Sequence, residues 1–349
     1  MPRNRVPGDK SYRREVLNIP GLTTLATLAA NGYSAVMLWQ RIVFGALLIA
    51  ALLGLIVADD ALDRTAFARD APGVLQSIGM VRCEGLLVVA VLVALVIAGS
   101  TELYRLLAAA GCAPLHLWPI LANVALVMVP FVAANGPAAD GAALLAADLR
   151  YTIVLFLIAL MGTCVLVAAR RKTDSAVAAI GSTLLAIVYL GLLPAYVVRL
   201  RLFGPTGAAW LLLYFVFTVK VCDIGAYFTG RVAGRHKLIA WLSPKKTVEG
   251  LVGGVAASVA FAVAVPLLVG LWADPASPIR EMFPPLLRCA SFGVLMALFG
   301  QAGDLLESLM KRDAAAKDAG NVIPAFGGLL DLLDSLLLTA PLACWILLE

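Results

Sequence analysis

The sequence predicts an all-α polytopic membrane protein with about nine transmembrane helices, its N-terminus in the cytoplasm and its C-terminus outside. Of the 349 residues, 62% are hydrophobic and only 14% are charged, and the mean hydropathy is +0.94. Ordinary soluble domains are less apolar and more charged than this. Apolar runs recur along the chain, near residues 42–58, 85–99, 115–134, 151–169, 176–198, 208–230, 251–272, 284–302 and 335–348.

The length of each run agrees with a membrane span. A helix needs about 20 apolar residues to cross a bilayer, and fewer where flanking residues snorkel or the bilayer thins. The shorter runs, 85–99 and 335–348, therefore still qualify as spans. The Ala and Gly content is typical of helices that pack closely in lipid.

The basic residues predict the orientation, because cytoplasmic segments carry an excess of Lys and Arg. With the N-terminus inside, 18 of the 27 basic residues fall on inner segments and 8 on outer segments, while Lys220 lies within a span. The polar loops 231–250 and 303–334 then face the cytoplasm, which is the compartment that contains nucleotides.

The chain divides into three regions by composition. No polar stretch is long enough to build a separate soluble core. Residues 1–41 form a basic cytoplasmic segment without a cleavable signal pattern, residues 42–207 form the N-terminal transmembrane helices, and residues 208–349 form a C-terminal transmembrane region that is expected to carry the chemistry. The net charge of +5 fits positive-inside anchoring to anionic lipid, so nucleic-acid binding is not expected.

Any metal ion must be held by oxygen ligands. The six cysteines are scattered without a CxxC pair, and His116 and His236 are the only histidines. Cysteines in apolar runs are usually buried and inert.

The polar stretch from Asp304 to Asp334 is the strongest candidate for a site, because charges beside lipid are costly unless they pair or bind something charged. If residues 301–312 extend the eighth span as a helix, four polar side chains share one face. They are Asp304, Glu307, Ser308 and Lys311. This face could hold a divalent ion and a phosphate, or it could be a solvated face with i,i+4 pairs.

The chain then returns to the membrane through a glycine turn. Gly327 and Gly328 would let backbone amides approach a phosphate closely, and Asp331 and Asp334 lie on the first turns of the last helix, where carboxylates can cap. Two acidic clusters on either side of a turn are typical of a Mg²⁺ site, since Mg²⁺ prefers oxygen ligands and substrate phosphates. Phosphoryl and nucleotidyl transfer require such charge neutralisation.

Two earlier segments add candidates. Anchoring explains the lysines of Ser243-Pro244-Lys245-Lys246-Thr247, but it does not require Thr247 or Glu249. Lys220 and Asp223 are three residues apart in the sixth span, where they either neutralise each other or form a polar wall of the same cavity.

These residues resemble the integral-membrane phosphatidate cytidylyltransferases, also called CDP-diacylglycerol synthases. The family signature runs Ser-x-x-Lys-Arg, four residues, Lys-Asp, a Pro-Gly-His-Gly-Gly turn and Asp-Arg-x-Asp. The matching positions are Ser308, Lys311, Arg312, Lys317, Asp318, Pro324, Gly327, Gly328, Asp331, Asp334 and Ser335, with Asp223, Ala226-Tyr227, Gly230-Arg231, Ser243 to Thr247 and Glu249-Gly250 upstream. A run this long is more specific than a single short motif.

The resemblance implies a CTP-dependent enzyme that converts phosphatidate, or a similar lipid phosphate, to CDP-diacylglycerol and pyrophosphate for phospholipid biosynthesis. It implies Mg²⁺ on Asp304, Asp331 and Asp334 and leaves room for a second cation. The implied catalytic residues are Asp304, Lys311, Arg312, Lys317, Asp318, Asp331 and Asp334. The implied substrate-binding residues are Asp223, Ser243, Lys245, Lys246, Thr247, Glu249, Ser308, Gly327 and Gly328. The expected location is the bacterial inner membrane with the active site facing the cytoplasm, and a homodimer is left open.

Three departures keep alternatives open. Ala325 stands where the family has Gly, Phe326 where it has His, and Leu332 where it has Arg. A related CTP-dependent enzyme acting on an isoprenoid lipid is one alternative. A transporter or membrane scaffold that uses Lys220 and Asp223 as an ion or proton relay is another.

Overall fold

The computed structural model describes residues 43–65, 76, 80, 82–137, 141–171, 173–204, 208–274, 277–280, 282–316, 319–320 and 327–348. Within these ranges, nine helices are long and apolar enough to cross a membrane, which confirms the predicted fold class of an integral membrane protein. Leu52–Ile323 and Gly327–Glu349 form one compact unit, and every contact discussed below lies within it. Of the second unit, only 43–51 belong to the described residues.

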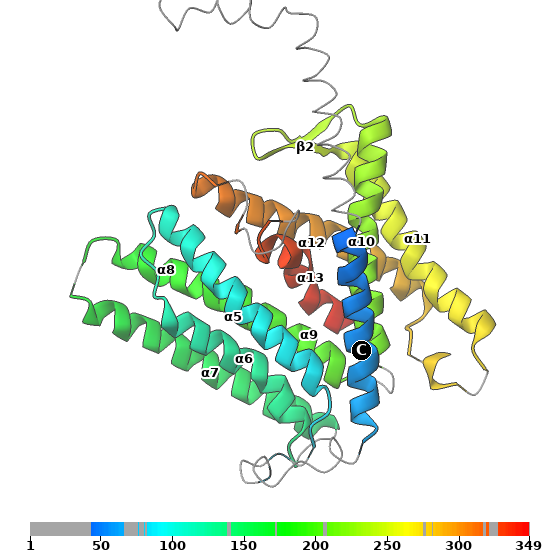
Figure 1. Ribbon diagram of the computed structural model, residues 1–349, viewed down its shortest axis with the longest axis horizontal. Helices are drawn as coiled ribbons and strands as arrows, with labels where there is room; N and C mark the ends of the chain where they lie inside the picture. Colours follow the sequence, from blue (N-terminus) through cyan, green and yellow to red (C-terminus); the bar gives the residue numbers. More distant parts are fainter. Residues whose placement is uncertain are drawn as a thin grey trace, which may run out of the picture. The chain divides into compact units, whose positions relative to one another are not determined.

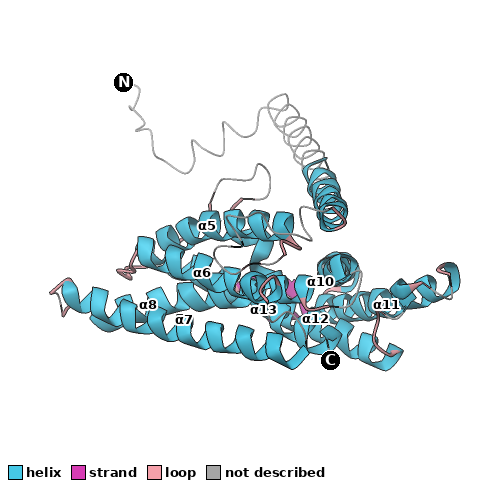
Figure 2. Cartoon of the chain, turned by 90° about the horizontal axis from the view of Figure 1, so that it is seen from below, coloured by secondary structure: helices cyan, strands magenta, loops and turns pink. Residues whose placement is uncertain are grey.

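The nine spans correspond one to one with the predicted apolar runs (Figures 1 and 2). The fifth span is broken by a π-helical turn, Val188–Leu192, between α8 and α9. The spans are Val43–Asp63, α5 (Leu86–Ala109), α6 (Leu117–Ala134), α7 (Gly141–Ala169), α8 (Ala176–Ile187) with α9 (Leu193–Leu202), α10 (Ala208–Ala233), α11 (Val248–Trp272), α12 (Leu286–Asp313) and α13 (Leu330–Leu348). A short 3₁₀ turn, Pro278–Arg280, precedes α12.

Several helices extend past their apolar runs. The expected helix over residues 301–312 is confirmed, because α12 continues to Asp313. The last helix begins at Leu330, so Asp331 lies in its first turn, as predicted. A helix satisfies its own backbone hydrogen bonds, so it can carry polar residues beyond the hydrocarbon without exposing peptide groups to lipid.

Two short strands between α10 and α11 were not expected from the sequence. Strands β1 (Lys237–Ile239) and β2 (Ser243–Thr247) pair antiparallel, with Lys237 opposite Thr247 and Ile239 opposite Ser243. Pro244 is tolerated because each strand of a two-stranded sheet is an edge strand. The hairpin ends where Thr247 caps α11, and its side-chain oxygen accepts a hydrogen bond from the Gly250 amide at 3.1 Å.

Helices α10 to α13 form a packed group in which each contacts the next (Figure 1). The buried hydroxyl of Ser258 on α11 lies 3.2 Å from the Thr218 carbonyl of α10 and 2.9 Å from the Gly293 carbonyl of α12. The hydroxyl of Tyr214 donates to the Ala262 carbonyl at 2.7 Å. These bonds fix the spacing of the helices that carry most of the predicted site residues.

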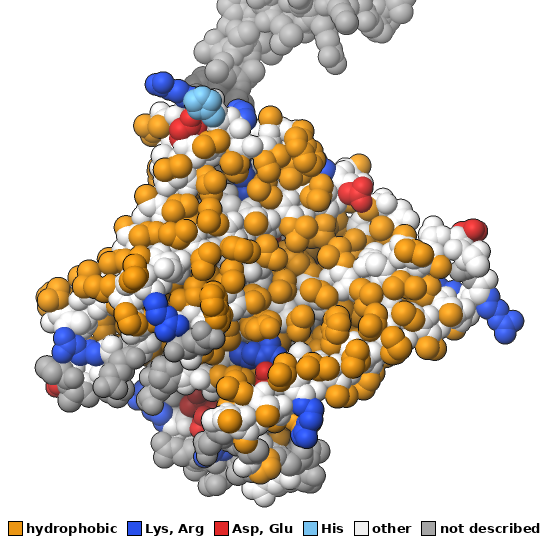
Figure 3. Space-filling view, turned by 180° about the vertical axis from the view of Figure 1, so that it is seen from behind, with side chains coloured by type: hydrophobic (Ala, Val, Ile, Leu, Met, Phe, Trp, Pro, Cys, Tyr) orange, Lys and Arg blue, Asp and Glu red, His pale blue; other side chains and the backbone are white. Residues whose placement is uncertain are grey.

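Hydrophobic side chains cover most of the face drawn in Figure 3. Large apolar side chains are highly exposed on several helices, including Leu287 at 81% and Trp272 at 87%. A soluble monomer rarely exposes apolar patches of this extent. The surface therefore agrees with contact to lipid.

Candidate functional site

A cavity of about 390 Å³ opens between α10, strand β2, α11 and α12. Its charged lining residues are Asp223, Arg231, Lys245, Lys246 and Asp304. Gly230 and Gly250 line it too, where α10 approaches α11 so closely that a Cβ on Gly250 would lie 2.9 Å from the Ala226 carbonyl oxygen. The sequence segments that resemble the cytidylyltransferases upstream therefore converge on one cavity.

Gln301 and Asp304 are the α12 residues that line this cavity. The Lys246 Nζ atom lies 2.6 Å from Asp304 Oδ2, and the two side chains are 18% and 34% exposed. Asp223 accepts a hydrogen bond from the Gln301 side chain at 3.2 Å and lies 3.6 Å from the Lys220 ammonium. Lys220 also donates to the Ser335 hydroxyl at 2.9 Å. Of the Lys220–Asp223 pair, Asp223 lines the cavity.

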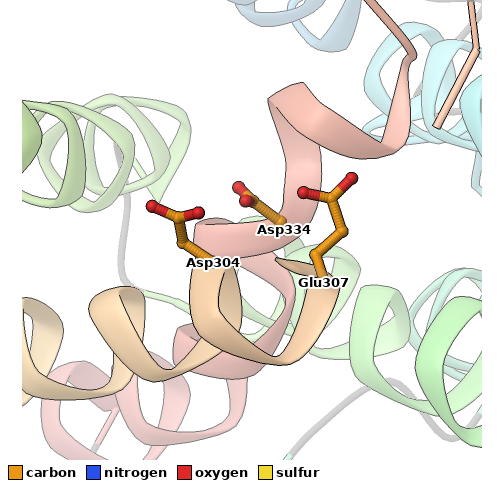
Figure 4. A group of neighbouring side chains, drawn as sticks. All are labelled: Asp304, Glu307 and Asp334. Atoms are coloured by element: carbon orange, nitrogen blue, oxygen red, sulfur yellow. The ribbon is translucent and has the colours of Figure 1, made fainter. Parts of the chain in front are cut away.

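Three carboxylates meet beside the cavity (Figure 4). Asp304 and Glu307 come from α12 and Asp334 from α13, and one oxygen of each lies within 4.8 Å of the others. Glu307 is 1% exposed and Asp334 is 5% exposed. Glu307 Oε1 is buried without a hydrogen-bond partner among the described residues. Buried carboxylates this close together repel each other unless a cation or a proton separates them.

Asp331 lies apart from this acidic group. One of its oxygens lies 2.5 Å from the Lys311 ammonium, and the other accepts hydrogen bonds from the amides of Gly328 at 2.8 Å and Ala319 at 3.2 Å. Lys311 also pairs with Glu307 at 2.8 Å. The structure thus joins Asp304 and Asp334 to Glu307, whereas the metal-binding role given to Asp331 stays a prediction.

The glycine turn is held by its neighbours. Gly327 has a φ of +99°, in the left-handed region that favours glycine, and the Gly328 amide, one of those predicted to approach a phosphate, donates to Asp331 instead. Glu102 of α5 accepts a hydrogen bond from the Leu330 amide at 3.0 Å. A Cβ on Gly328 would lie 2.7 Å from the backbone nitrogen of Gly320, so a side chain there would force the backbone of the turn to shift.

The remaining predicted residues lie at the edges of the site. Glu249 accepts hydrogen bonds from the Arg235 and His236 amides at 3.0 and 3.2 Å, which closes the start of the hairpin. Ser243 and Ser308 are half-buried, and Arg312 is exposed on the last turn of α12. Lys317 and Asp318 lie outside the described residues, as do Ala325 and Phe326 among the departures.

Two residues of the site, Gln301 and Glu102, were not singled out from the sequence. Glu307 belonged to the predicted polar face that could hold a divalent ion, but it was not among the metal ligands that the resemblance implies. Glu102 lies three residues past the apolar run 85–99, and an ionisable residue at the end of a membrane span is a signal that could have been used to find it. Its contact with Leu330 spans 228 positions of the sequence, which no local pattern can indicate.

The donor set fits a hard divalent cation. Mg²⁺ prefers oxygen ligands, and the acidic group brings three carboxylates together with one oxygen of each within 4.8 Å of the others. Five carboxylates interact here with the ammonium groups of Lys220, Lys246 and Lys311. The carboxylates are Asp223, Asp304, Glu307, Asp331 and Asp334.

The fold and the site define an integral membrane protein in which a basic cavity adjoins a cluster of buried carboxylates. Comparison with known families agrees, since the family model described as the Cytidylyltransferase family matches residues 72–348. The chain belongs to the Cytidylyltransferase family.

Individual relatives match part of the chain. A protein of Bacillus subtilis named phosphatidate cytidylyltransferase is 34% identical across 48% of this chain and 58% of its own length. A protein of the same name from Synechocystis is 38% identical across 48% of this chain and 61% of its own. An uncharacterized Escherichia coli protein, YnbB, is 35% identical across 42% of this chain and 45% of its own length. The matched part of the chain spans about half the length of these curated relatives.

Proposed function

We propose that this protein is a CTP:phosphatidate cytidylyltransferase that makes CDP-diacylglycerol and pyrophosphate. One observation carries the proposal: Asp304 belongs both to the basic cavity and to the acidic group. A nucleoside triphosphate in the cavity would therefore have lysine and arginine side chains on one side and a cation on the other. Family membership and the names of the two bacterial relatives support the same reaction.

The reaction needs no nucleophile from the protein. An oxygen of the lipid phosphate attacks the α-phosphorus of CTP, and a P–O bond forms while the bond between the α-phosphorus and the bridging oxygen breaks. Pyrophosphate leaves with that oxygen. Catalysis then rests on positioning two anions and on stabilising the charge that develops on the leaving group.

The chain's own residues supply these functions. Lys245, Lys246 and Arg231 line the cavity and would bind phosphate oxygens, because ammonium and guanidinium groups form strong charge-assisted hydrogen bonds to phosphate. Asp304, Glu307 and Asp334 would hold Mg²⁺, whose chemistry when bound is to neutralise the triphosphate charge. Lys311 balances the negative charge on Glu307 and Asp331, with which it forms ion pairs.

The proposal includes a location. Both polar segments, 231–250 and 303–334, would face the cytoplasm, as the distribution of basic residues predicts. The protein would then take CTP from the cytoplasm and a lipid phosphate from the inner leaflet of a bacterial inner membrane.

Two other functions were open from the sequence. A CTP-dependent enzyme acting on an isoprenoid phosphate would use the same cavity, and no observation favours it over phosphatidate. A transporter would use Lys220 and Asp223 as a relay across the membrane. Asp223 lines the same cavity as Lys246 and Asp304, which favours a role for the pair in anion and cation binding.

The test is a label-transfer assay with the purified full chain. CTP labelled at its α-phosphate is supplied with Mg²⁺ and either phosphatidate or an isoprenyl phosphate. We expect label in the lipid fraction with phosphatidate, together with an equal amount of pyrophosphate. Transfer to the isoprenyl phosphate alone would change the acceptor, and no transfer to either lipid would refute the assignment.

A further inference from the structure

Tyr189 lies in the π-helical turn that interrupts the fifth span. Such turns are rare inside helices and are frequent at functional sites. Pro194 follows closely, and a proline has no amide hydrogen and clashes with the carbonyl four residues before it, here that of Leu190. The wide turn relieves this conflict and sets the direction of Tyr189.

The Tyr189 hydroxyl is buried without a partner. The residue is 1% exposed, and its hydroxyl makes no hydrogen bond within the described part of the chain. Buried polar atoms are nearly always hydrogen-bonded, because an unpaired hydroxyl loses its bonds to water without replacement. By contrast, the buried hydroxyl of Tyr214 donates to a carbonyl at 2.7 Å.

The surroundings of Tyr189 identify what could complete its bonding. It shares one buried cluster with Met310 of α12 and with Leu330 and Leu333 of α13, the two helices that carry the acidic group. Leu333 is the neighbour of Asp334 in α13, and Met310 follows Glu307 by three residues in α12, so the cluster places Tyr189 beside the acidic group. Glu307 Oε1 is likewise buried without a partner among the residues described.

We propose that Tyr189 is a positioning residue of the acidic group, whose hydroxyl donates a hydrogen bond to an oxygen atom bound there with the cation. The oxygen belongs either to water on the cation or to a phosphate of the nucleotide, and both offer the same acceptor chemistry. The inference rests on the proposed function, because it requires a cation held by Asp304, Glu307 and Asp334.

Thermal unfolding of the full chain in detergent tests this, with Mg²⁺ titrated in the absence and presence of CTP. The variants are Tyr189→Phe and, as a matched control, Tyr214→Phe, which removes a buried hydroxyl that has a protein partner. Without Mg²⁺, we expect Tyr189→Phe to unfold at or above the wild-type temperature and Tyr214→Phe to unfold below it.

The Mg²⁺ concentration that gives half-maximal thermal stabilisation should be about tenfold higher in Tyr189→Phe than in the wild type, as expected for losing one hydrogen bond to a charged group. It should stay at the wild-type value in Tyr214→Phe. If this concentration changes in Tyr189→Phe with Mg²⁺ alone, the acceptor is water on the cation. If it changes only when CTP is present, the acceptor is a phosphate oxygen.

Two results would overturn the inference. One is a Tyr189→Phe variant with wild-type midpoints in both titrations. The other is a Tyr189→Phe variant that is unstable or unfolded without Mg²⁺, since the hydroxyl would then serve the fold. If neither Mg²⁺ nor CTP stabilises the wild type, the proposed cation site is wrong as well. If the wild type is active and stabilised, only the role given to Tyr189 is wrong.

Discussion

Asp304, Asp331 and Asp334 are the same residue type, but they lie in different surroundings. Asp304 and Asp334 meet Glu307 in the acidic group, whereas Asp331 accepts hydrogen bonds from two backbone amides and from Lys311. A carboxylate whose oxygens are already occupied by donors is a poorer metal ligand. Glu307, with one buried oxygen unpartnered within the described chain, is better placed to bind a cation.

This difference predicts that two substitutions have different effects on cation binding. Glu307→Gln should raise the Mg²⁺ concentration needed for half-maximal thermal stabilisation by roughly tenfold, because it removes a buried charged ligand. Asp331→Asn should leave that concentration unchanged and lower the unfolding temperature, since it weakens the turn at Gly328.

Asp60→Asn is the control for both, because Asp60 lies on the first described span, where it pairs with the exposed Arg64, and it belongs to neither the cavity lining nor the acidic group. The interpretation would be contradicted if Asp331→Asn weakened Mg²⁺ binding and Glu307→Gln did not.

At the scale of elements, periodicity and composition predicted all nine spans, because a membrane helix needs an unbroken apolar run. The helical extension through Arg312 was predicted from the spacing of Asp304, Glu307 and Lys311, and α12 confirms it. The hairpin 237–247 was missed, since its strands are short and Pro244 argues against a strand. The π turn at Tyr189 was missed as well, because it follows from a local conflict with Pro194 that apolar periodicity does not report.

The candidate site was predictable where residues are close in sequence and much less so where they are distant. Asp304 and Glu307 share a helix face by spacing alone, and the match to a family linked that face to Lys245 and Lys246. Nothing in the sequence indicated that Glu102 would bind the Leu330 amide. Such contacts depend on how the helices pack, and packing is decided by the whole set of side chains at each interface.

On the scale of the whole molecule, buried ion pairs join helices that are far apart in the sequence. Arg201 of α9 donates to Asp59 at 2.8 Å and also pairs with Asp63, both on the first described span. Arg199 donates to Asp148 of α7 at 2.8 Å. The sequence suggested only outer-loop charges at these arginines. Since these side chains are at most 17% exposed, removing one partner would leave an uncompensated buried charge.

We therefore expect Arg201→Ala to destabilise the protein by about 3–5 kcal/mol, the usual effect of breaking a buried pair. Arg64→Ala provides the matched control, because Arg64 pairs with Asp60 of the same helix and its side chain is 73% exposed. Exposed pairs contribute about 0–1 kcal/mol. Denaturant unfolding of both variants measures the difference, and equal stabilities would show that the buried pair does not hold α9 to the first span.

The central claim is that Asp304 links a nucleotide cavity to a cation held by the acidic group. The most direct measurement is transfer of labelled CMP from CTP to phosphatidate by Asp304→Asn, beside the wild type and Asp60→Asn over a range of Mg²⁺ concentrations. The wild type and Asp60→Asn should transfer label at equal rates, and Asp304→Asn should be slower by at least about a hundredfold at every Mg²⁺ concentration, because a preorganised charge at the reacting phosphates is lost. The claim would be contradicted if Asp304→Asn transferred label at a rate within about threefold of the wild-type rate, since losing such a charge should slow the reaction far more.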